Sequence, residues 1–207
     1  MFLALDHYAL AANPSLQRSM FADRAQQFVG RHRWPLRLNT TGLEIDEFDD
    51  VLTTYCVVEE AGRHLTSARL RPAGVGSMVE RHFPALWDTD LRGGVEITRF
   101  CASPALTPDN RLASVSDLLL GLCRHCQRCG IGGFFGIVFP SVGRVIRQAG
   151  WPAAILNELR DADGTLLLAQ WTPSNLVAWD IQERREMREE IWNRRRELAP
   201  EPERLVA

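Results

Sequence analysis

The stretch Val95-Glu96-Ile97-Thr98-Arg99-Phe100 has the composition of a β-strand, but it places a carboxylate and a guanidinium within an apolar run. Upstream, Ala68-Arg69-Leu70-Arg71-Pro72 carries arginines inside another predicted strand, and Glu44-Ile45-Asp46-Glu47-Phe48-Asp49 is an acidic cluster. Carboxylates and arginines avoid apolar runs unless they form ion pairs or take part in chemistry. We therefore expect the three segments to meet at one functional site.

Composition limits the class of protein. The chain has 207 residues, of which 45% are hydrophobic, and this suits one domain with a substantial core. A net charge of −2 gives no electrostatic reason to expect a nucleic-acid partner. No apolar run approaches the roughly 18 to 20 residues that cross a bilayer. The segment Met1–Asp6 lacks the basic region of a signal peptide, so we expect a cytoplasmic protein with no membrane partner.

All 24 basic residues are arginine. The lack of lysine excludes a Schiff-base lysine, the lysine of a phosphate-binding loop and a lysine general base. No G-x-G-x-x-G motif follows a predicted strand, so a dinucleotide-binding or nucleoside-triphosphate enzyme is not expected.

Apolar periodicity predicts alternating strands and helices over residues 1–207, which we treat as one domain. A helix is expected at 16–30, a hairpin turns at Ala61-Gly62, and Ser77 caps a short helix at 77–83. The C-terminal helix, at about 175–198, is strongly charged. Strands mixed with helices predict an α/β (α+β) sandwich. The remaining predicted strands are 54–59, 66–71, 95–102, 133–139, 153–158 and 165–171, and the remaining predicted helices are 114–129 and 141–148.

Three of the five cysteines form the pattern C-x-x-C-x-x-C at Cys123, Cys126 and Cys129. With His125, this spacing suggests a metal or iron–sulfur site. However, the segment 114–128 has helical periodicity, and a ferredoxin-type site would need a fourth ligand and a following proline. A buried or partly exposed helix is therefore the favoured interpretation, and we expect no metal.

The charged and aromatic positions, taken in order, resemble the acyl-homoserine-lactone synthases, the autoinducer synthases of bacterial quorum sensing. The resemblance spans about residues 20 to 151. It rests on Arg24-x3-Phe28-x5-Trp34, Glu44-x-Asp46-x-Phe48-Asp49, Arg69-Leu-x-Pro72, Phe83-Pro84, Glu96-x-x-Arg99-Phe100 and Val145-Ile-x3-Gly150-Trp151. The chain departs from the family pattern after Pro72, where Ala73-Gly74 replace the usual threonines.

The resemblance implies a GNAT-like three-layer sandwich, with a twisted mixed β-sheet flanked by helices. It also implies transfer of an acyl group from acyl-carrier protein or acyl-CoA to the amine of S-adenosylmethionine, followed by lactonisation and release of methylthioadenosine. S-adenosylmethionine is then a substrate, and no cofactor is expected. A carboxylate must take a proton from the amine before it attacks the thioester, and Glu96 is our choice for that base.

The resemblance also implies roles for other residues. Arg69 and Arg99 belong to the catalytic shell with Glu96, and Thr98 is expected near the acyl donor. The expected S-adenosylmethionine cleft comprises Arg24, Phe28, Trp34, Asp46, Asp49 and Phe83. Two alternatives remain open: the charged members could form a structural salt-bridge network, and Phe28 and Phe83 could belong to the core.

We expect the acyl pocket between the sheet and helix 114–129, lined by Leu118, Leu122, Phe134, Ile137 and Phe139. A carrier protein is acidic, so its docking surface should be basic. Candidate residues for it are Arg124, Arg128, Arg144 and Arg147, although solvated helix faces explain them equally well. Two other functions remain open: a GNAT-type CoA-dependent N-acyltransferase, and a non-catalytic module that binds S-adenosylmethionine or an acyl carrier.

Overall fold

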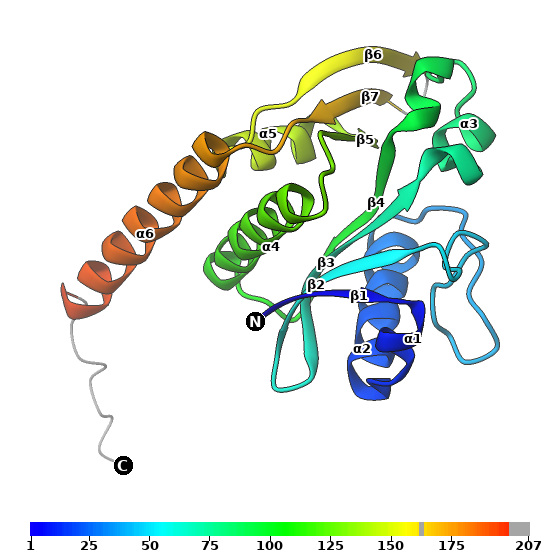
Figure 1. The fold of residues 1–207 in the computed structure, drawn as a ribbon. Coiled ribbons are helices and arrows are strands. Elements are labelled where there is room, and N and C mark those ends of the chain that lie inside the picture. The colour runs from blue at the N-terminus through cyan, green and yellow to red at the C-terminus, as the bar shows by residue number, and fades with distance from the viewer. Residues whose placement is uncertain (162–163, 199–207) are drawn as a thin grey trace.

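The computed structural model describes residues 1–161 and 164–198. A mixed seven-stranded sheet runs through the molecule in the order β1-β2-β3-β4-β5-β7-β6 (Figure 1). Strands β4 and β5 pair in parallel, and the other neighbouring strands pair antiparallel. The strands are β1 (Phe2–Asp6), β2 (Thr54–Glu60), β3 (Arg63–Pro72), β4 (Val95–Ala102), β5 (Phe134–Val138), β6 (Ala154–Asp161) and β7 (Gly164–Trp171).

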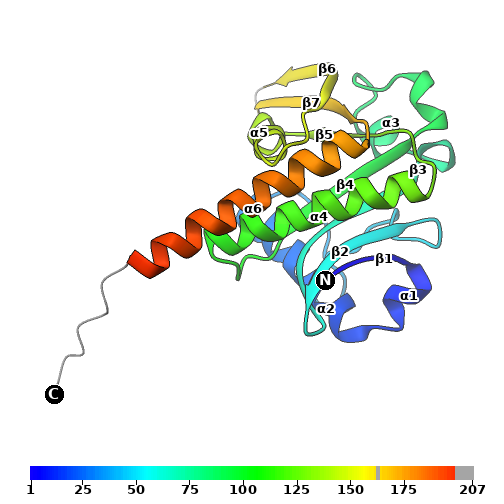
Figure 2. The ribbon, with the colours of Figure 1, turned by 60° about the vertical axis from the view of Figure 1, so that its left-hand side comes forward.

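Helices cover both faces of the sheet. Helices α1 (His7–Ala11) and α2 (Pro14–Arg24) lie on one face, and α4 (Pro108–Arg128) and α6 (Asn175–Leu198) lie side by side on the other (Figure 2). Alternation along β2 explains both contacts, because successive side chains of a strand point to opposite faces. Cys56 and Val58 belong to the core cluster with α4, whereas Tyr55 and Val57 pack with α1 and α2. The predicted three-layer sandwich is therefore confirmed.

The predicted elements correspond to observed ones within about three residues, except that α4 begins at Pro108, six residues before the predicted start at 114. The hairpin at Ala61-Gly62 joins β2 to β3, and Ser77 caps α3 (Met78–His82). Strand β1 and helix α1 were not predicted. The ring of Phe2 lies so close to Gly121 of α4 that a Cβ there would come within 2.1 Å of it, so glycine is required at this crossing. Within the two described ranges, no helix is long and apolar enough to span a membrane.

Strands β4 and β5 diverge soon after they meet. They pair only at Val95 with Phe134 and at Glu96 with Phe135. Gly136 allows the close approach that precedes the divergence, because a Cβ there would meet the backbone oxygen of Ile97 at 2.4 Å. Beyond these two pairs the sheet is split between β4 and β5 (Figure 1). Helix α5 (Pro140–Gln148) follows β5 in the chain.

Short helical segments connect the main elements. A π-helix, η1 (Ala25–Arg31), extends α2, and the 3-10 segments η2 (Ala73–Val75) and η3 (Thr89–Gly93) lie between β3 and β4. π-Helical turns are rare and often occur at functional sites. In this chain η1 carries Phe28, one of the residues expected at the site.

Candidate active site

Three arginines and three carboxylates form a closed ring of ion pairs between α2, strands β3 and β4, and the loop that carries the acidic cluster, residues 44–49, which we call the acidic loop. Each arginine contacts two of the carboxylates, and each carboxylate contacts two of the arginines, so the formal charges cancel. We call this set the ion ring. Its members, in order around the ring, are Arg24, Glu44, Arg99, Asp46, Arg69 and Asp49.

The buried half of the ion ring is centred on Arg24 and Asp49. The Arg24 guanidinium donates two parallel hydrogen bonds to Asp49, at 3.0 and 2.9 Å, and its Nε donates to Glu44 at 2.6 Å. Both Arg24 and Asp49 side chains are 1% exposed. Burial opposes ionisation of Asp49, but the charges of Arg24 and Arg69 outweigh it and hold the pKa of that carboxyl well below its usual range. These two residues therefore act as a structural ion pair.

A β-bulge in β4 orients Arg99, which lies in the other half of the ion ring. Ser67 pairs with Cys101 and Arg69 pairs with Thr98, so two residues of β4 lie opposite one residue of β3. Arg99 occupies the bulge with a φ of 54°, a strained conformation for a residue other than glycine. Its Nη2 donates to Glu44 at 2.9 Å and to Asp46 at 2.7 Å. In a regular strand Arg99 and Thr98 would point to opposite faces of the sheet, so the bulge brings them to one site.

Arg69 connects the ion ring to Thr98. Its Nε donates to Thr98 Oγ1 at 2.9 Å, and its other nitrogens donate to both oxygens of Asp46, at 2.5 and 3.1 Å. The Arg69 guanidinium also lies 5.7 Å from the centre of the Phe48 ring. Arg69 is 1% exposed and does not line the cavity, so it orients Asp46 and Thr98 from the buried side of the site.

The π-helix stacks two aromatic rings beside the ion ring. The backbone N–H of Trp34 donates to the Phe28 carbonyl at 2.8 Å. The two rings are nearly parallel, with an interplanar angle of 6° and centroids 4.9 Å apart. The Arg99 guanidinium lies 5.7 Å from the Phe28 ring centre. A flat aromatic surface therefore adjoins the charged groups.

A cavity of about 860 Å³ extends from the ion ring into the core. Its charged and polar end includes Glu44, Asp46, Glu47, Thr98 and Arg99. Aromatic and aliphatic side chains form most of the remaining wall. They are Phe28, Trp34, Pro35, Leu36, Ile45, Phe48, Met78, Phe83, Ile97, Phe100, Leu119, Phe134, Ile137, Val138, Phe139, Val142, Ile146, Trp151, Leu166 and Trp171. The wall also carries His32, Arg37, His82 and Ser141.

Most of the residues expected in the cleft lie on this wall. Phe28, Trp34, Asp46 and Phe83 line the cavity, whereas Arg24 and Asp49 lie behind it. The ion ring is a network of ion pairs, and its Glu44, Asp46 and Arg99 also line the cavity. Phe28 is only 5% exposed, so it belongs to the core and to the wall.

Three of the five residues expected in the acyl pocket line the cavity, and the other two do not. Phe134, Ile137 and Phe139 line the cavity. Leu118 and Leu122 are fully buried in the core cluster and do not line it, because α4 turns them toward its neighbours in that core. The neighbouring Leu119 lines the cavity in their place.

Glu96 lies beside the cavity and is not part of its wall. Its carboxylate accepts hydrogen bonds from Ser77 Oγ at 3.0 Å and from the backbone N–H groups of Met78 and Val79, each at 2.8 Å. Ser77 is the N-cap residue of α3, and Met78 and Val79 are its first two residues, so Glu96 caps that helix. In this arrangement Glu96 holds α3 against β4, and Met78 reaches the cavity wall.

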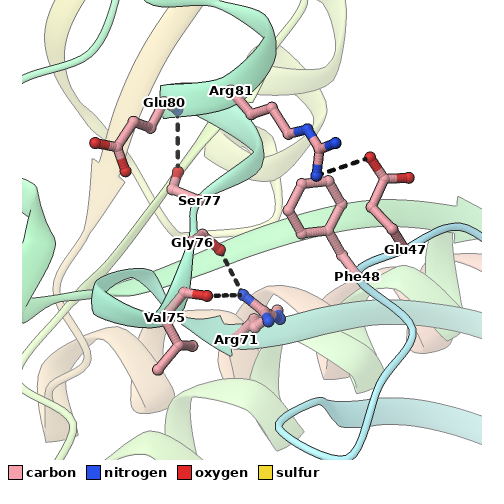
Figure 3. Close-up of a pocket in the computed structure, with 8 residues that line it drawn as sticks. All are labelled: Glu47, Phe48, Arg71, Val75, Gly76, Ser77, Glu80 and Arg81. Atoms are coloured by element: carbon pink, nitrogen blue, oxygen red, sulfur yellow. Dashed lines mark hydrogen bonds and ion pairs between the residues drawn. The ribbon is translucent and has the colours of Figure 1, made fainter.

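A smaller pocket of about 320 Å³ adjoins the cavity (Figure 3). Glu47 and Phe48 line both. The Arg81 guanidinium reaches across the Phe48 ring to Glu47, at 3.5 Å, and Arg71 donates to the carbonyls of Val75 and Gly76. Arg81 and Glu47 are well exposed, so their ion pair connects α3 to the acidic loop at the surface.

The cysteine segment forms a helix, as the favoured interpretation predicts. Cys123 and Cys126 are buried on α4, and Cys129, at its end, is exposed with its sulfur 3.8 Å from His125 Nε2. Within residues 1–161 and 164–198, no group of three or more His, Cys, Asp or Glu residues is arranged to hold a metal ion.

The four arginines proposed for docking are all exposed. Arg124 and Arg128 lie on α4, and Arg144 and Arg147 lie on α5. Arg124 donates to Gln182 of α6 at 2.9 Å. Their role in docking stays a prediction.

Sequence reasoning missed part of the apolar wall. Leu119, Ile146, Trp151 and Trp171 come from α4, α5 and β7 and from the segment after α5. Their apolar character predicted only burial, and only the three-dimensional arrangement separates a wall residue from a core residue. Glu44 belonged to the quoted acidic cluster, but its two arginine partners could not be predicted from spacing.

The sequence is similar to those of known proteins. The sequence profile of the autoinducer synthase family matches residues 7–176. An acyl-homoserine-lactone synthase of Agrobacterium fabrum is 26% identical over 176 residues, which are 80% of this chain and 82% of that protein.

Solved structures show the same fold. BjaI is a CoA-dependent acyl-homoserine lactone synthase whose structure contains SAM and isopentyl-CoA. It superposes with a TM-score of 0.76 at 20% identity, over 90% of this chain and 89% of that one. An acyl-CoA N-acyltransferase from Pseudomonas aeruginosa superposes with a TM-score of 0.55 at 16% identity, over 82% of this chain and 98% of that one. These matches confirm the GNAT-like fold, and together with the profile they show that the chain belongs to the autoinducer synthase family.

Proposed function

We propose that this protein is an acyl-homoserine-lactone synthase. The α-amine of S-adenosylmethionine attacks an acyl thioester, so that an amide bond forms and the thiol leaves. The methionine carboxylate then attacks its own γ-carbon, which closes the lactone and releases methylthioadenosine. The observation that carries this proposal is one continuous cavity with a charged end at the ion ring and an apolar end in the core.

The charged end suits S-adenosylmethionine, which combines a sulfonium, an ammonium and a carboxylate. Glu44 and Asp46 on the wall complement the two cationic groups, and the Arg99 guanidinium complements the carboxylate. The stacked rings of Phe28 and Trp34 offer an aromatic surface for the adenine or the sulfonium. Because the ion ring is already neutral and fixed, it is preorganised to receive a ligand that carries both signs of charge.

The amine must lose a proton before it attacks. The hydrogen bonds of Glu96 occupy its carboxylate in capping α3, which supports a positioning role for this residue. Glu44, Asp46 and Glu47 are the carboxylates on the cavity wall. One of them, acting directly or through water, is the proposed proton acceptor.

Release of methylthioadenosine is the experiment that tests the function. Purified protein is incubated with S-adenosylmethionine and a panel of acyl-CoA and acyl-carrier-protein thioesters. We expect acyl-dependent release, with an acyl-homoserine lactone in the extract. Asp46→Asn should lose this activity, and Arg18→Ala, on the exposed side of α2, should keep it. If S-adenosylmethionine binds but no thioester releases methylthioadenosine, the protein is a binding module.

The acyl donor is either CoA or a carrier protein. BjaI, which shares the fold, is CoA-dependent, whereas the exposed arginines of α4 and α5 favour an acidic carrier. Arg144→Glu with Arg147→Glu separates the two donors. Turnover should fall with acyl-carrier protein and stay unchanged with acyl-CoA if the arginines dock a carrier. If the double variant turns over both donors as fast as the wild type does, these arginines do not dock a carrier protein.

A CoA-dependent N-acyltransferase that acts on another amine is the second candidate. The fold shared with the acyl-CoA N-acyltransferase favours it. It predicts that thiol is released from acyl-CoA in the presence of another amine, without release of methylthioadenosine.

We propose that the enzyme works in the cytoplasm and without a cofactor. All five cysteines are free, which suits a reducing compartment. S-adenosylmethionine supplies the amine and carboxylate nucleophiles and the methylthioadenosine leaving group, and the acyl donor supplies the thiol that leaves, so the chemistry needs no further group. Dialysis against a chelator should therefore leave the release of methylthioadenosine unchanged.

A further inference from the structure

The carboxylates on the cavity wall differ in how many of their acceptor sites are already filled. They belong to Glu44, Asp46 and Glu47 of the acidic loop. An ionised carboxylate has about four lone-pair sites, two on each oxygen. A carboxylate whose four sites all hold hydrogen-bond donors can take up a proton only if one of those donors leaves. Counting the donors therefore separates a group that orients a ligand from a group that can act as a base.

All four sites of Asp46 are filled. Its Oδ1 accepts from Arg69 at 2.5 Å and from the backbone N–H of Phe48 at 2.8 Å. Its Oδ2 accepts from Arg69 at 3.1 Å and from Arg99 at 2.7 Å. Guanidinium groups supply three of these four donors, and such charge-assisted hydrogen bonds are about twice as strong as neutral ones. Asp46 is therefore held as an anion that complements the charge of a ligand.

Glu44 is filled in the same way. Its Oε1 accepts from Nε and Nη2 of Arg99, at 3.1 and 2.9 Å. Its Oε2 accepts from Nε of Arg24 at 2.6 Å and lies 2.5 Å from Nη2 of the same residue. The Glu44 side chain is 1% exposed, so bulk water cannot carry a proton away from it. Protonation of either Glu44 or Asp46 would open the ion ring.

Glu47 differs from both neighbours in its contacts and in its exposure. Its Oε1 lies 3.5 Å from Nη1 of Arg81 and 3.6 Å from Nε2 of His82, and both distances exceed the ~2.7–3.2 Å of an N–H···O hydrogen bond. Figure 3 shows the second oxygen turned away from Arg81, and within residues 1–161 and 164–198 no group donates a hydrogen bond to it. The Glu47 side chain is 49% exposed. Glu47 therefore has free acceptor sites on the cavity wall and direct contact with water.

We infer that Glu47 is the base that takes a proton from the amine of S-adenosylmethionine, directly or through one water molecule. This inference rests on the proposed function and names which of the three carboxylates on the wall performs the step. The ammonium gives one proton to Glu47, and the freed lone pair of its nitrogen attacks the carbonyl carbon of the thioester. The C–S bond breaks, the leaving thiolate takes the second proton of that nitrogen, and Glu47 passes the first proton to water.

The wall also carries two imidazoles that can accept a proton, those of His32 and His82. A neutral imidazole has no charge that attracts an ammonium. Glu47 follows Asp46 directly in the chain and adds a carboxylate to the end of the cavity that suits the cationic groups of the substrate. Attraction between the charges therefore favours Glu47 as the acceptor, and a histidine base is the competing outcome of the test.

Glu47→Gln removes the base and keeps the size of the side chain. With the acyl donor that the wild type uses best, we expect kcat for release of methylthioadenosine at pH 7 to fall about 100-fold. Binding of S-adenosylmethionine, measured by calorimetric titration, should weaken less than about tenfold, because the ion ring is untouched. Glu47→Asp keeps a carboxylate and should recover part of the turnover.

The pH dependence of kcat separates a lost base from a disturbed structure. An α-amine has an ordinary pKa of about 7.7–8.0, so at pH 9 most of the substrate has already lost its proton. The deficit of Glu47→Gln should therefore shrink to less than about tenfold at pH 9. A structural defect would persist at both pH values.

Glu80→Gln is the matched control, because Glu80 pairs with Arg92 and lines the smaller pocket but not the cavity. It should keep wild-type turnover at both pH values. Three results would overturn the inference and leave the proposed function standing: wild-type turnover in Glu47→Gln, a deficit that is as large at pH 9 as at pH 7, or the pH-dependent loss appearing in His82→Gln or His32→Gln instead. A wild type that releases no methylthioadenosine with any thioester would overturn both.

Discussion

Ser77 Oγ donates a hydrogen bond to Glu96 Oε1 at 3.0 Å, and this contact attaches the start of α3 to strand β4 of the sheet. The same carboxylate accepts the N–H groups of Met78 and Val79. Glu96 is 2% exposed, so all three hydrogen bonds are shielded from water. The residue expected from the sequence to be the catalytic base therefore also anchors α3, and its part in catalysis stays a prediction.

Glu96→Gln tests this positioning role. The amide keeps one acceptor oxygen but brings its NH2 group toward a backbone N–H donor, so we expect the free energy of unfolding to fall by about 1.5–3 kcal/mol. Turnover should fall as α3 loosens, but the pH dependence of kcat should keep its shape, because no titrating base is lost. Urea denaturation and a pH–rate profile measure the two effects. Loss of one limb of the profile without loss of stability would restore Glu96 as the base.

Asp49→Asn removes one negative charge from the ion ring. The buried guanidinium of Arg24 then keeps only Glu44 as a carboxylate partner. We expect the free energy of unfolding at pH 7 to fall by about 3–5 kcal/mol. The pKa of Asp49 is depressed in the folded state, so its ionised form stabilises the fold fully above the unfolded-state pKa of about 3.9. That stabilisation is lost as the pH falls through the folded-state pKa, and the difference between variant and wild type should narrow on acidification.

Asp50→Asn is the matched control for this substitution. Asp50 pairs with Arg71 at 2.7 Å, but its side chain is 35% exposed, so the substitution should cost less than about 1 kcal/mol. Urea titrations at pH 7, 5 and 3 compare the two variants. An Asp49→Asn deficit that is as large at pH 3 as at pH 7 would contradict the role assigned to the ion ring.

Trp34→Ala removes the outer ring of the aromatic stack. If the stack holds the adenine or the sulfonium, binding of S-adenosylmethionine should weaken by about 1–3 kcal/mol, whereas Trp34→Phe should lose less. Calorimetric titration measures the affinity directly. The KM for the acyl thioester should change little, because the stack adjoins the ion ring. Equal changes for both substrates would indicate a general collapse of the cavity.

The layers of the fold could be predicted from the sequence, but the position of every residue at the site could not. Alternation and periodicity predicted the strands and helices, because burial follows period 2 or 3.6 in regular elements. The bulge at Arg99 breaks that period, and no local pattern signals it. Strand β1 was missed because a five-residue strand at a chain end gives little periodicity. Leu118 and Leu119 are adjacent and equally apolar, so only the packing of α4 decides which one faces the cavity.

The thiols should differ sharply in reactivity. Burial raises the pKa of Cys101 and Cys126 to about 12, and it raises the pKa of Cys56 as well, whereas Cys129 is exposed. We expect one fast-labelling thiol in native protein at pH 8 and five in denaturant. Cys129→Ser should abolish the fast phase. If stoichiometric zinc protects several thiols from labelling, the cysteines of α4 bind a metal ion after all.

Leu119→Ala and Leu118→Ala form a matched pair that tests the position of the acyl chain. Both side chains are at most 2% exposed on α4, so each substitution should cost about 2–5 kcal/mol of stability. Leu119→Ala also lengthens the apolar end of the cavity, and the ratio of kcat/KM for longer over shorter acyl thioesters should rise about tenfold. Leu118→Ala opens a void behind the wall and should leave that ratio unchanged. Equal shifts in both variants would mean that the acyl chain does not lie against α4.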